Sequence, residues 1–177
     1  MSIYTRKIST QVGSMIIGAN DDGIYLFDYE YRKMLPKIQQ RITNHSGKDF
    51  IEGYHPLHDL LQAQLDDYFI GTRTSFELPL QLSGSPFQVK VWELLLTIPY
   101  GETRSYKQQA LSFGDEKAIR AIASANGANC LAIIVPCHRV VGADNSLTGY
   151  AGGLPSKKWL LEHERKHGLM SYQKELF

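Results

Sequence analysis

Cysteine is scarce in this 177-residue chain, which contains only Cys130 and Cys137. Two cysteines in a chain of this length do not make a small disulfide-stabilised domain, which relies on several cross-links. If the segment between them were extended, their Cα atoms would lie about 23 Å apart. A disulfide needs a separation of about 7 Å or less. The sequence therefore predicts two free thiols, as is usual in a reducing compartment.

Long apolar runs are also absent. No stretch approaches the roughly 18 residues of a membrane-spanning helix, and residues 1–7 lack the apolar core of a signal peptide. We therefore expect a cytoplasmic protein with no membrane partner. Charge is nearly balanced at +1 overall, but residues 85–177 carry 11 Lys and Arg against 8 Asp and Glu. If the protein binds a polyanion, residues 85–177 are therefore the part of the chain to inspect first.

The first 82 residues predict a small α/β unit. Its expected elements, in chain order, are strands over residues 14–20 and 24–29 joined by an Asp-Gly turn, a helix over 32–42, a polar loop over 43–49, a helix over 57–70 and an edge strand over 76–82. His55 and His58 lack a credible third metal ligand. This unit therefore shows no catalytic constellation.

The second unit, residues 83–177, begins with a clear helix signal. Ser85, Pro86 and Gln88 have the types and spacing of an N-cap, a first-turn proline and the reciprocal residue of a capping box. We expect this helix to run until Pro99, since proline cannot continue it.

Two further helices, over residues 103–113 and 116–126, are separated by a Gly-Asp turn. This arrangement is typical of a helix-turn-helix. Apart from Arg120, the outer face of the second helix consists of small residues, which would let its backbone approach a partner surface closely. Two helices and a turn also occur in many α-rich domains, so both interpretations stay open at this point.

An apolar run over residues 131–135 ends at Pro136 and is followed directly by Cys137 and His138. Such a run predicts a buried strand, which Pro136 ends because it has no N–H to donate. A thiol mounted at the end of a rigid strand is suited to nucleophilic attack. A free cysteine is also commonly an inert core residue, so a packing role is the alternative.

The last expected helix covers residues 155–166, with Gly168 as its C′ residue. Glu164 lies four positions after Leu160 and three after Leu161, so it shares their apolar face. A carboxylate there needs a hydrogen-bond partner or a changed pKa. An imidazole would serve, and His138 is the candidate.

Two other patterns point to chemistry that we reject. His163, Glu164 and His167 fit the H-E-x-x-H pattern of zinc proteases, but the sequence supplies no third ligand at a useful distance. The glycine-rich loop over residues 142–153 lacks a following Gly-Lys-Ser/Thr. We therefore expect neither a metal nor a nucleotide cofactor.

Taken together, the motifs of the second unit resemble those of the O6-alkylguanine-DNA alkyltransferase family, in particular bacterial Ogt and the C-terminal part of Ada. The resemblance covers residues 85–168 and rests on segments in family order: 99–106, 120–123, Asn129, 136–140, 149–153 and 159–164. It implies a ribonuclease-H-like α/β domain over residues 1–82, which agrees in outline only. It also implies a mostly helical domain over residues 83–177 that carries the helix-turn-helix and the active-site cysteine.

The resemblance implies direct-reversal DNA repair by a single-turnover transfer. Cys137 would accept the alkyl group from guanine O6, or from thymine O4, and form a stable thioether. His138 would ionise the thiol through a water molecule, and Glu164 would orient that histidine. Tyr106 would supply a proton to the leaving guanine, and Asn129 would tie the active-site turn to the recognition helix.

The same resemblance implies a duplex DNA partner that is bound through the minor groove without sequence preference. A base inside a duplex hides its O6 atom, so the nucleotide must be flipped out, and Arg120 would fill the vacated stack. The other implied DNA contacts are Tyr106, Ala121, Ser124 and Gly127. The implied pocket for the flipped base consists of Val140, Tyr150 and Ala151.

Two positions depart from the family pattern. Cys130 stands where the family commonly has proline, and Ala151 stands where many members carry serine.

We expect a monomer without a cofactor. The alternatives are a non-enzymatic DNA-damage-binding module, whose known types lack the cysteine, and a Cys-His hydrolase. Adjacent Cys137 and His138 together with a helix-turn-helix argue against the hydrolase.

Overall fold

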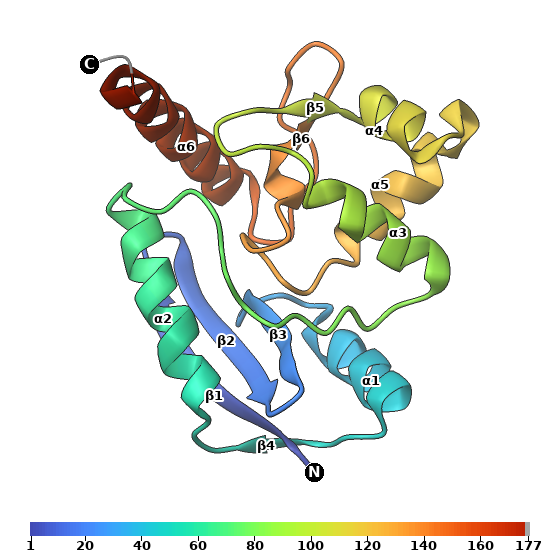
Figure 1. Cartoon of the computed structure of the whole chain (residues 1–177). Coiled ribbons are helices and arrows are strands. Elements are labelled where there is room, and N and C mark those ends of the chain that lie inside the picture. The colour runs from blue at the N-terminus through green and yellow to red at the C-terminus, as the bar shows by residue number, and fades with distance from the viewer. Residues whose placement is uncertain (176–177) are drawn as a thin grey trace.

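The first half of the chain forms a four-stranded mixed sheet with two helices (Figure 1). The computed structural model describes residues 1–175, with side chains described through residue 168. The strand order is β3-β2-β1-β4; the first three strands pair antiparallel and the last pairs parallel to β1. The elements are β1 (Ile3–Thr10), β2 (Gly13–Asn20), β3 (Gly23–Tyr29), α1 (Leu35–Ser46), β4 (Phe50–Glu52) and α2 (Pro56–Phe69).

The expected hairpin and the expected helix before Gly71 are confirmed as β2–β3 and α2. Gly23 has φ of 141°, a backbone conformation that favours glycine, and this supports the tight turn. Helix α1 begins later than predicted and continues to Ser46, so the loop predicted over residues 43–49 is mostly helical. Gly47, with φ of 69°, ends this helix by donating its N–H to the Thr43 carbonyl at 2.8 Å.

The edge strand predicted over residues 76–82 is wrong. Only Leu80 forms a bridge, parallel to Ile24, and the rest of the segment is irregular. Pro79 donates no hydrogen bond, so a longer ladder cannot form there. Strands β1 and β4 were not predicted, because their sequences, IYTRKIST and FIE, lack a sustained alternation of apolar and polar residues.

The second half contains the helices and short strands that carry the site. These are α3 (Pro86–Leu95), β5 (Arg104–Ser105), α4 (Tyr106–Phe113), η1 (Glu116–Ala118), α5 (Ile119–Gly127), η2 (Cys137–Arg139), β6 (Val140–Val141) and α6 (Leu154–Glu175). The capping box of Ser85 and Gln88 is confirmed, although α3 ends four residues before Pro99. Helix α6 continues through Gly168, which is therefore not its C′ residue.

One hydrophobic core contains residues from both halves of the chain. Phe27 and Tyr29 of β3, Tyr68 of α2 and Trp92 of α3 are all buried in it. The predicted boundary at residues 82 and 83 falls in the irregular segment between α2 and α3. Within residues 1–175, no helix is both long and apolar enough to cross a membrane.

Candidate active site

The segment that precedes Cys137 is a buried turn and not the predicted strand. Only Leu131 forms a bridge, to Phe27 of β3, and the chain then folds back with the Val135 N–H donating to the Leu131 carbonyl at 2.8 Å. Ile133 has φ of 69°, which is unusual for a β-branched residue and costs about 1–3 kcal/mol. An apolar run predicts that its residues are buried, but burial alone does not distinguish a strand from a packed turn.

Cys137 begins the short helix η2 and is half-buried, whereas Cys130 is buried. Both thiols are free, as expected, although the extended spacing assumed between them is wrong. The Asn129 Nδ2 atom donates to Cys137 Sγ at 3.3 Å and to the Val135 carbonyl at 2.8 Å. Burial raises the pKa of the Cys137 thiol, while the Asn129 hydrogen bond and the nearby Lys157 charge oppose the rise. The thiol therefore needs a base before it can act as a nucleophile.

His138 and Glu164 meet as the sequence predicts. His138 Nε2 lies 2.7 Å from Glu164 Oε1, and both side chains are buried. Because a carboxylate only accepts hydrogen bonds, Nε2 carries a proton in this contact. The other ring nitrogen, Nδ1, is buried and has no hydrogen-bond partner among the described residues. In the neutral ring this nitrogen holds a lone pair and can accept a proton.

Arg139 and Tyr68 also donate hydrogen bonds to Glu164, and sequence reasoning missed both. Arg139 donates from Nε to Oε2 at 2.8 Å and from Nη2 to Oε1 at 3.0 Å, and the Tyr68 hydroxyl donates to Oε1 at 2.8 Å. Burial alone would raise the pKa of Glu164, but His138 and Arg139 hold it well below its usual range. Arg139 follows Cys137 and His138 directly in sequence, and this position is the signal that could have identified it. Tyr68 lies on α2, and nothing local marks it.

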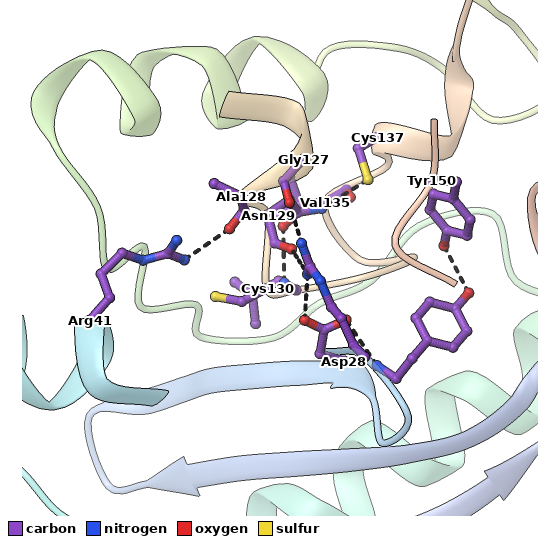
Figure 2. Close-up of polar contacts among 12 residues, drawn as sticks. Asp28, Arg41, Gly127, Ala128, Asn129, Cys130, Val135, Cys137 and Tyr150 are labelled. Carbon is purple, nitrogen blue, oxygen red and sulfur yellow. Dashed lines mark hydrogen bonds and ion pairs between the residues drawn. The ribbon is translucent and has the colours of Figure 1, made fainter. Parts of the chain in front are cut away.

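The residues implied for a substrate pocket lie next to the thiol turn. Val140 is buried in β6, while Tyr150 and Ala151 are half-buried in the following loop. The Tyr150 hydroxyl lies 2.9 Å from the Tyr29 hydroxyl (Figure 2), and its ring makes an edge contact with His138 at a centroid distance of 6.5 Å. A side chain at Gly152 would collide with the Tyr29 ring. Tyr29 of strand β3 therefore packs against this loop and supports it.

Lys157 is a fully buried lysine that the sequence did not reveal as part of the site. Its Nζ atom donates to the Val140 carbonyl at 2.6 Å and to the Thr148 carbonyl at 2.9 Å, so it binds the pocket loop to β6. Burial lowers its pKa. Tyr106, at the start of α4, donates its hydroxyl to the same Thr148 carbonyl at 3.2 Å. This contact places Tyr106 at the pocket loop.

Helix α5 presents the expected face of small residues. The exposed residues of this face are Arg120, Ala121, Ser124 and Gly127. Its opposite face packs inside, where Trp92 Nε1 donates to the Ala125 carbonyl at 2.8 Å and the Asn126 and Gln109 amides pair with each other. The chain passes from α5 through Asn129 directly into the thiol turn. The exposed helix and the nucleophile are therefore parts of one continuous segment.

The histidines of the H-E-x-x-H pattern do not converge with Glu164. His163 Nε2 contacts the Tyr68 carbonyl at 2.7 Å and its ring stacks on Trp159, while His167 Nδ1 contacts the His163 carbonyl at 2.8 Å. Glu164 faces His138 instead. No cluster of three or more metal-ligating side chains is found in the part of the chain that the structure describes.

Comparison with known proteins identifies the family. Residues 86–166 match the family described as the DNA-binding domain of 6-O-methylguanine DNA methyltransferase. A methylated-DNA–protein-cysteine methyltransferase of Methanosarcina barkeri is 39% identical over 93% of this chain and 99% of its own length. The constitutive enzyme of that name from Bacillus subtilis is 53% identical over 93% of this chain and 96% of its own length.

A solved structure agrees with these sequence matches. The crystal structure of Mycobacterium tuberculosis OGT in complex with DNA superposes with a TM-score of 0.79 at 37% identity, covering 93% of this chain and 94% of that one. The chain belongs to the methylated-DNA–protein-cysteine methyltransferase family.

Proposed function

We propose that this protein repairs DNA by transferring the alkyl group of O6-alkylguanine or O4-alkylthymine to the sulfur of Cys137. The observation that carries the proposal is the half-buried thiol of Cys137 on the turn that follows α5, next to the buried pair of His138 and Glu164 at 2.7 Å. Membership of a family whose curated members carry the methyltransferase name supports it. Each protein molecule reacts only once, because the alkylated sulfur has no S–H proton to lose and therefore cannot form a thiolate nucleophile again.

The site supports the following sequence of bond changes. His138 Nδ1 accepts the Cys137 thiol proton through a bridging water, while Glu164 stabilises the resulting imidazolium charge. The thiolate attacks the alkyl carbon, so that an S–C bond forms as the C–O6 bond breaks. The electron pair passes to guanine, which takes up a proton, and Tyr106 is the proposed donor. The Asn129 N–H stabilises the thiolate by a charge-assisted hydrogen bond.

Access to the guanine O6 atom requires the nucleotide to leave the duplex. We propose that α5 lies in the minor groove, where its exposed small residues allow close approach without reading the base sequence. Arg120 projects from the exposed start of this helix and would occupy the vacated stack. Tyr150, Val140 and Ala151 would line the pocket for the flipped base.

Several finer assignments belong to the same proposal. A parallel fourth strand on three antiparallel strands supports the ribonuclease-H-like description of residues 1–82. Helices α4 and α5 with Gly114 between them support the helix-turn-helix in residues 83–177. The free thiols are compatible with the cytoplasm. A monomer is expected, and a sedimentation or light-scattering mass of about one chain would support it.

Incubation with duplex DNA that contains O6-methylguanine tests the proposal directly. The peptide containing Cys137 should gain about 14 Da, the mass added when a methyl group replaces the thiol hydrogen. The peptide containing Cys130 alone should remain unchanged, and the Cys137→Ser variant should gain nothing. DNA binding without a mass gain would favour the damage-binding module. Turnover of an ester or peptide substrate would favour the hydrolase.

A further inference from the structure

A buried ion pair at the end of β3 lies directly beneath the α5–Cys137 segment. Arg32 Nη1 is 2.6 Å from Asp28 Oδ2, and the two side chains are 8% and 0% exposed. Asp28 also accepts a hydrogen bond from the Tyr29 backbone N–H at 2.8 Å. The carboxylate is therefore fixed in place by its own strand, and it holds the guanidinium in a single orientation.

The same guanidinium reaches across to the second half of the chain. Arg32 donates from Nη1 to the Asn129 carbonyl at 2.8 Å and from Nη2 to the Gly127 carbonyl. Arg41 of α1 donates to the Ala128 carbonyl, between them, at 2.9 Å. Figure 2 shows Asp28 and Arg41 on the sheet side and the three carbonyl-bearing residues above them. Two arginines thus bind three consecutive carbonyl groups.

These carbonyls belong to the last residue of α5, Gly127, to its C-cap residue, Ala128, and to Asn129, the first residue beyond the helix. The last carbonyls of a helix lack intrahelical partners and carry the negative end of the helix dipole. Cationic donors at this end satisfy the carbonyl groups and fix the direction in which the chain leaves the helix. Here the chain leaves directly into Asn129, whose side-chain amide donates to Cys137 Sγ.

We propose that Arg32, oriented by Asp28, is a positioning residue for the proposed alkyl transfer: it fixes Asn129, and thereby the hydrogen bond to the Cys137 sulfur and the end of the DNA-facing helix. The chain of contacts is continuous, from the Asp28 carboxylate through Arg32 to the Asn129 backbone and side chain, and then to the sulfur. This inference rests on the proposed function for its biological meaning. The contacts themselves predict an effect on the thiol that does not depend on DNA.

An arginine is required for this arrangement. Its planar fork binds the Asp28 carboxylate and the carbonyls of Gly127 and Asn129 at once, whereas a lysine ammonium is a point charge on a flexible stem. The Arg32→Lys variant keeps the positive charge and can keep the ion pair with Asp28. It cannot hold both carbonyls in the same plane, so Asn129 should lose its fixed position.

The test measures the reactivity of the Cys137 thiol as a function of pH. Carbamidomethylation by iodoacetamide is followed for the Cys137 peptide by mass spectrometry, which separates it from Cys130. The midpoint of this pH dependence is the pH at which the carbamidomethylation rate of Cys137 reaches half its maximum. In Arg32→Lys we expect the midpoint to rise by about 0.5–1 pH unit, because the hydrogen bond that stabilises the thiolate is weakened. Transfer from free O6-benzylguanine at neutral pH should slow by about three- to tenfold, following the smaller thiolate fraction. The charged and titratable groups that interact with this thiol are Asp28, Tyr29, Arg32, Tyr150 and Lys157, and His138 is its neighbour in sequence.

Two further variants and a measurement of helix content distinguish loss of positioning from loss of folding. Asp28→Asn keeps the shape of the anchor but removes a negative charge that itself raises the pKa of the Cys137 thiol, so a direct charge effect alone would lower the midpoint. A rise of the midpoint in this variant is therefore expected only if Arg32, once released, no longer fixes Asn129. Arg6→Lys is the matched control: Arg6 pairs with Asp59 at 2.9 Å at the surface and should leave the midpoint unchanged. Circular dichroism should show native helix content for all three variants.

A double variant establishes whether Arg32 acts through Asn129. In the Asn129→Ala background, Arg32→Lys should produce no additional shift of the midpoint, because the hydrogen bond to sulfur is already gone. An unchanged midpoint in folded Arg32→Lys, or an undiminished further shift in the double variant, would overturn the inference. If wild-type Cys137 accepted no alkyl group while the midpoint still moved, the positioning role would stand and the proposed function would fail.

Discussion

Glu164 is a buried carboxylate that receives hydrogen bonds from three side chains, His138, Arg139 and Tyr68. Burying a charge costs free energy unless the charge is paired, and here two cationic or potentially cationic partners meet it. Removing one member of such a buried pair leaves an uncompensated charge and typically costs about 3–5 kcal/mol. The position therefore contributes both to stability and to the proposed chemistry.

The Glu164→Gln variant should separate these contributions. A neutral amide stabilises the imidazolium of His138 less, so transfer from O6-methylguanine duplex to Cys137 should slow by at least about tenfold. The rate is measured by mass spectrometry of the Cys137 peptide over a range of pH. Glu162→Gln is the control, since Glu162 is exposed on the same helix and, among the side chains that the structure describes, forms an ion pair with Lys158 alone, at 3.9 Å. An unchanged pH–rate profile in folded Glu164→Gln would contradict the role assigned to Glu164.

Local sequence identified part of the site at the residue scale. Cys137 and His138 are adjacent in sequence, and the helical spacing of Glu164 placed it on an inward face. Tyr68 and Lys157 were missed for different reasons. Tyr68 is 96 residues from its partner Glu164, and only tertiary packing brings them together. Lys157 has no sequence mark of burial, because lysine is usually solvent-exposed.

At the scale of elements, α5 and the thiol turn form one mechanical unit. The Arg120 end of α5 is exposed, and the other end continues into Asn129 and Cys137. The effect of a variant on DNA contact can therefore be distinguished from its effect on the reaction at the sulfur by comparing rates with a DNA substrate and with a free base.

Arg120→Ala should slow repair of O6-methylguanine in duplex DNA by about tenfold or more, because in the proposed mechanism the Arg120 side chain takes the place of the flipped nucleotide in the base stack. Transfer from free O6-benzylguanine, which needs no flipping, should remain near the wild-type rate. Lys117→Ala removes a positive charge from the exposed element just before α5 and serves as the control for non-specific electrostatic binding. Equal losses of rate on DNA and on the free base would count against the flipping role.

At the scale of the whole molecule, buried polar contacts join the two halves of the chain. Tyr68 of α2 donates to Glu164 of α6, and Arg32 binds the end of α5. Each contact joins an element of residues 1–82 to the site. The first half of the chain therefore supports the site through defined hydrogen bonds as well as through the common hydrophobic core.

The depressed pKa of Glu164 predicts how stability depends on pH. A carboxyl group whose pKa is lower in the folded state stabilises that state fully above its unfolded pKa of about 4.3. This contribution is lost as the pH falls through the folded pKa. The free energy of unfolding, measured by urea titration, should therefore decrease below about pH 5, and this decrease should be smaller in Glu164→Gln. Parallel curves for the two proteins between pH 5 and pH 3 would show that Glu164 is not the group responsible.

The sequence by itself determined the local features of this protein. The β2–β3 hairpin, the helix over Pro56–Phe69, the Ser85 capping box and the adjacency of Cys137 and His138 all follow from short-range residue order, because turns, caps and periodicity act over a few residues. Only the tertiary structure decided the rest. Residues 131–135, which burial alone could not assign, form a tight turn and not the expected strand, because the Val135 N–H bonds back to the Leu131 carbonyl. Long-range packing brought Arg32, Tyr68 and Lys157 to the site, since partners distant in the chain meet only when the core assembles.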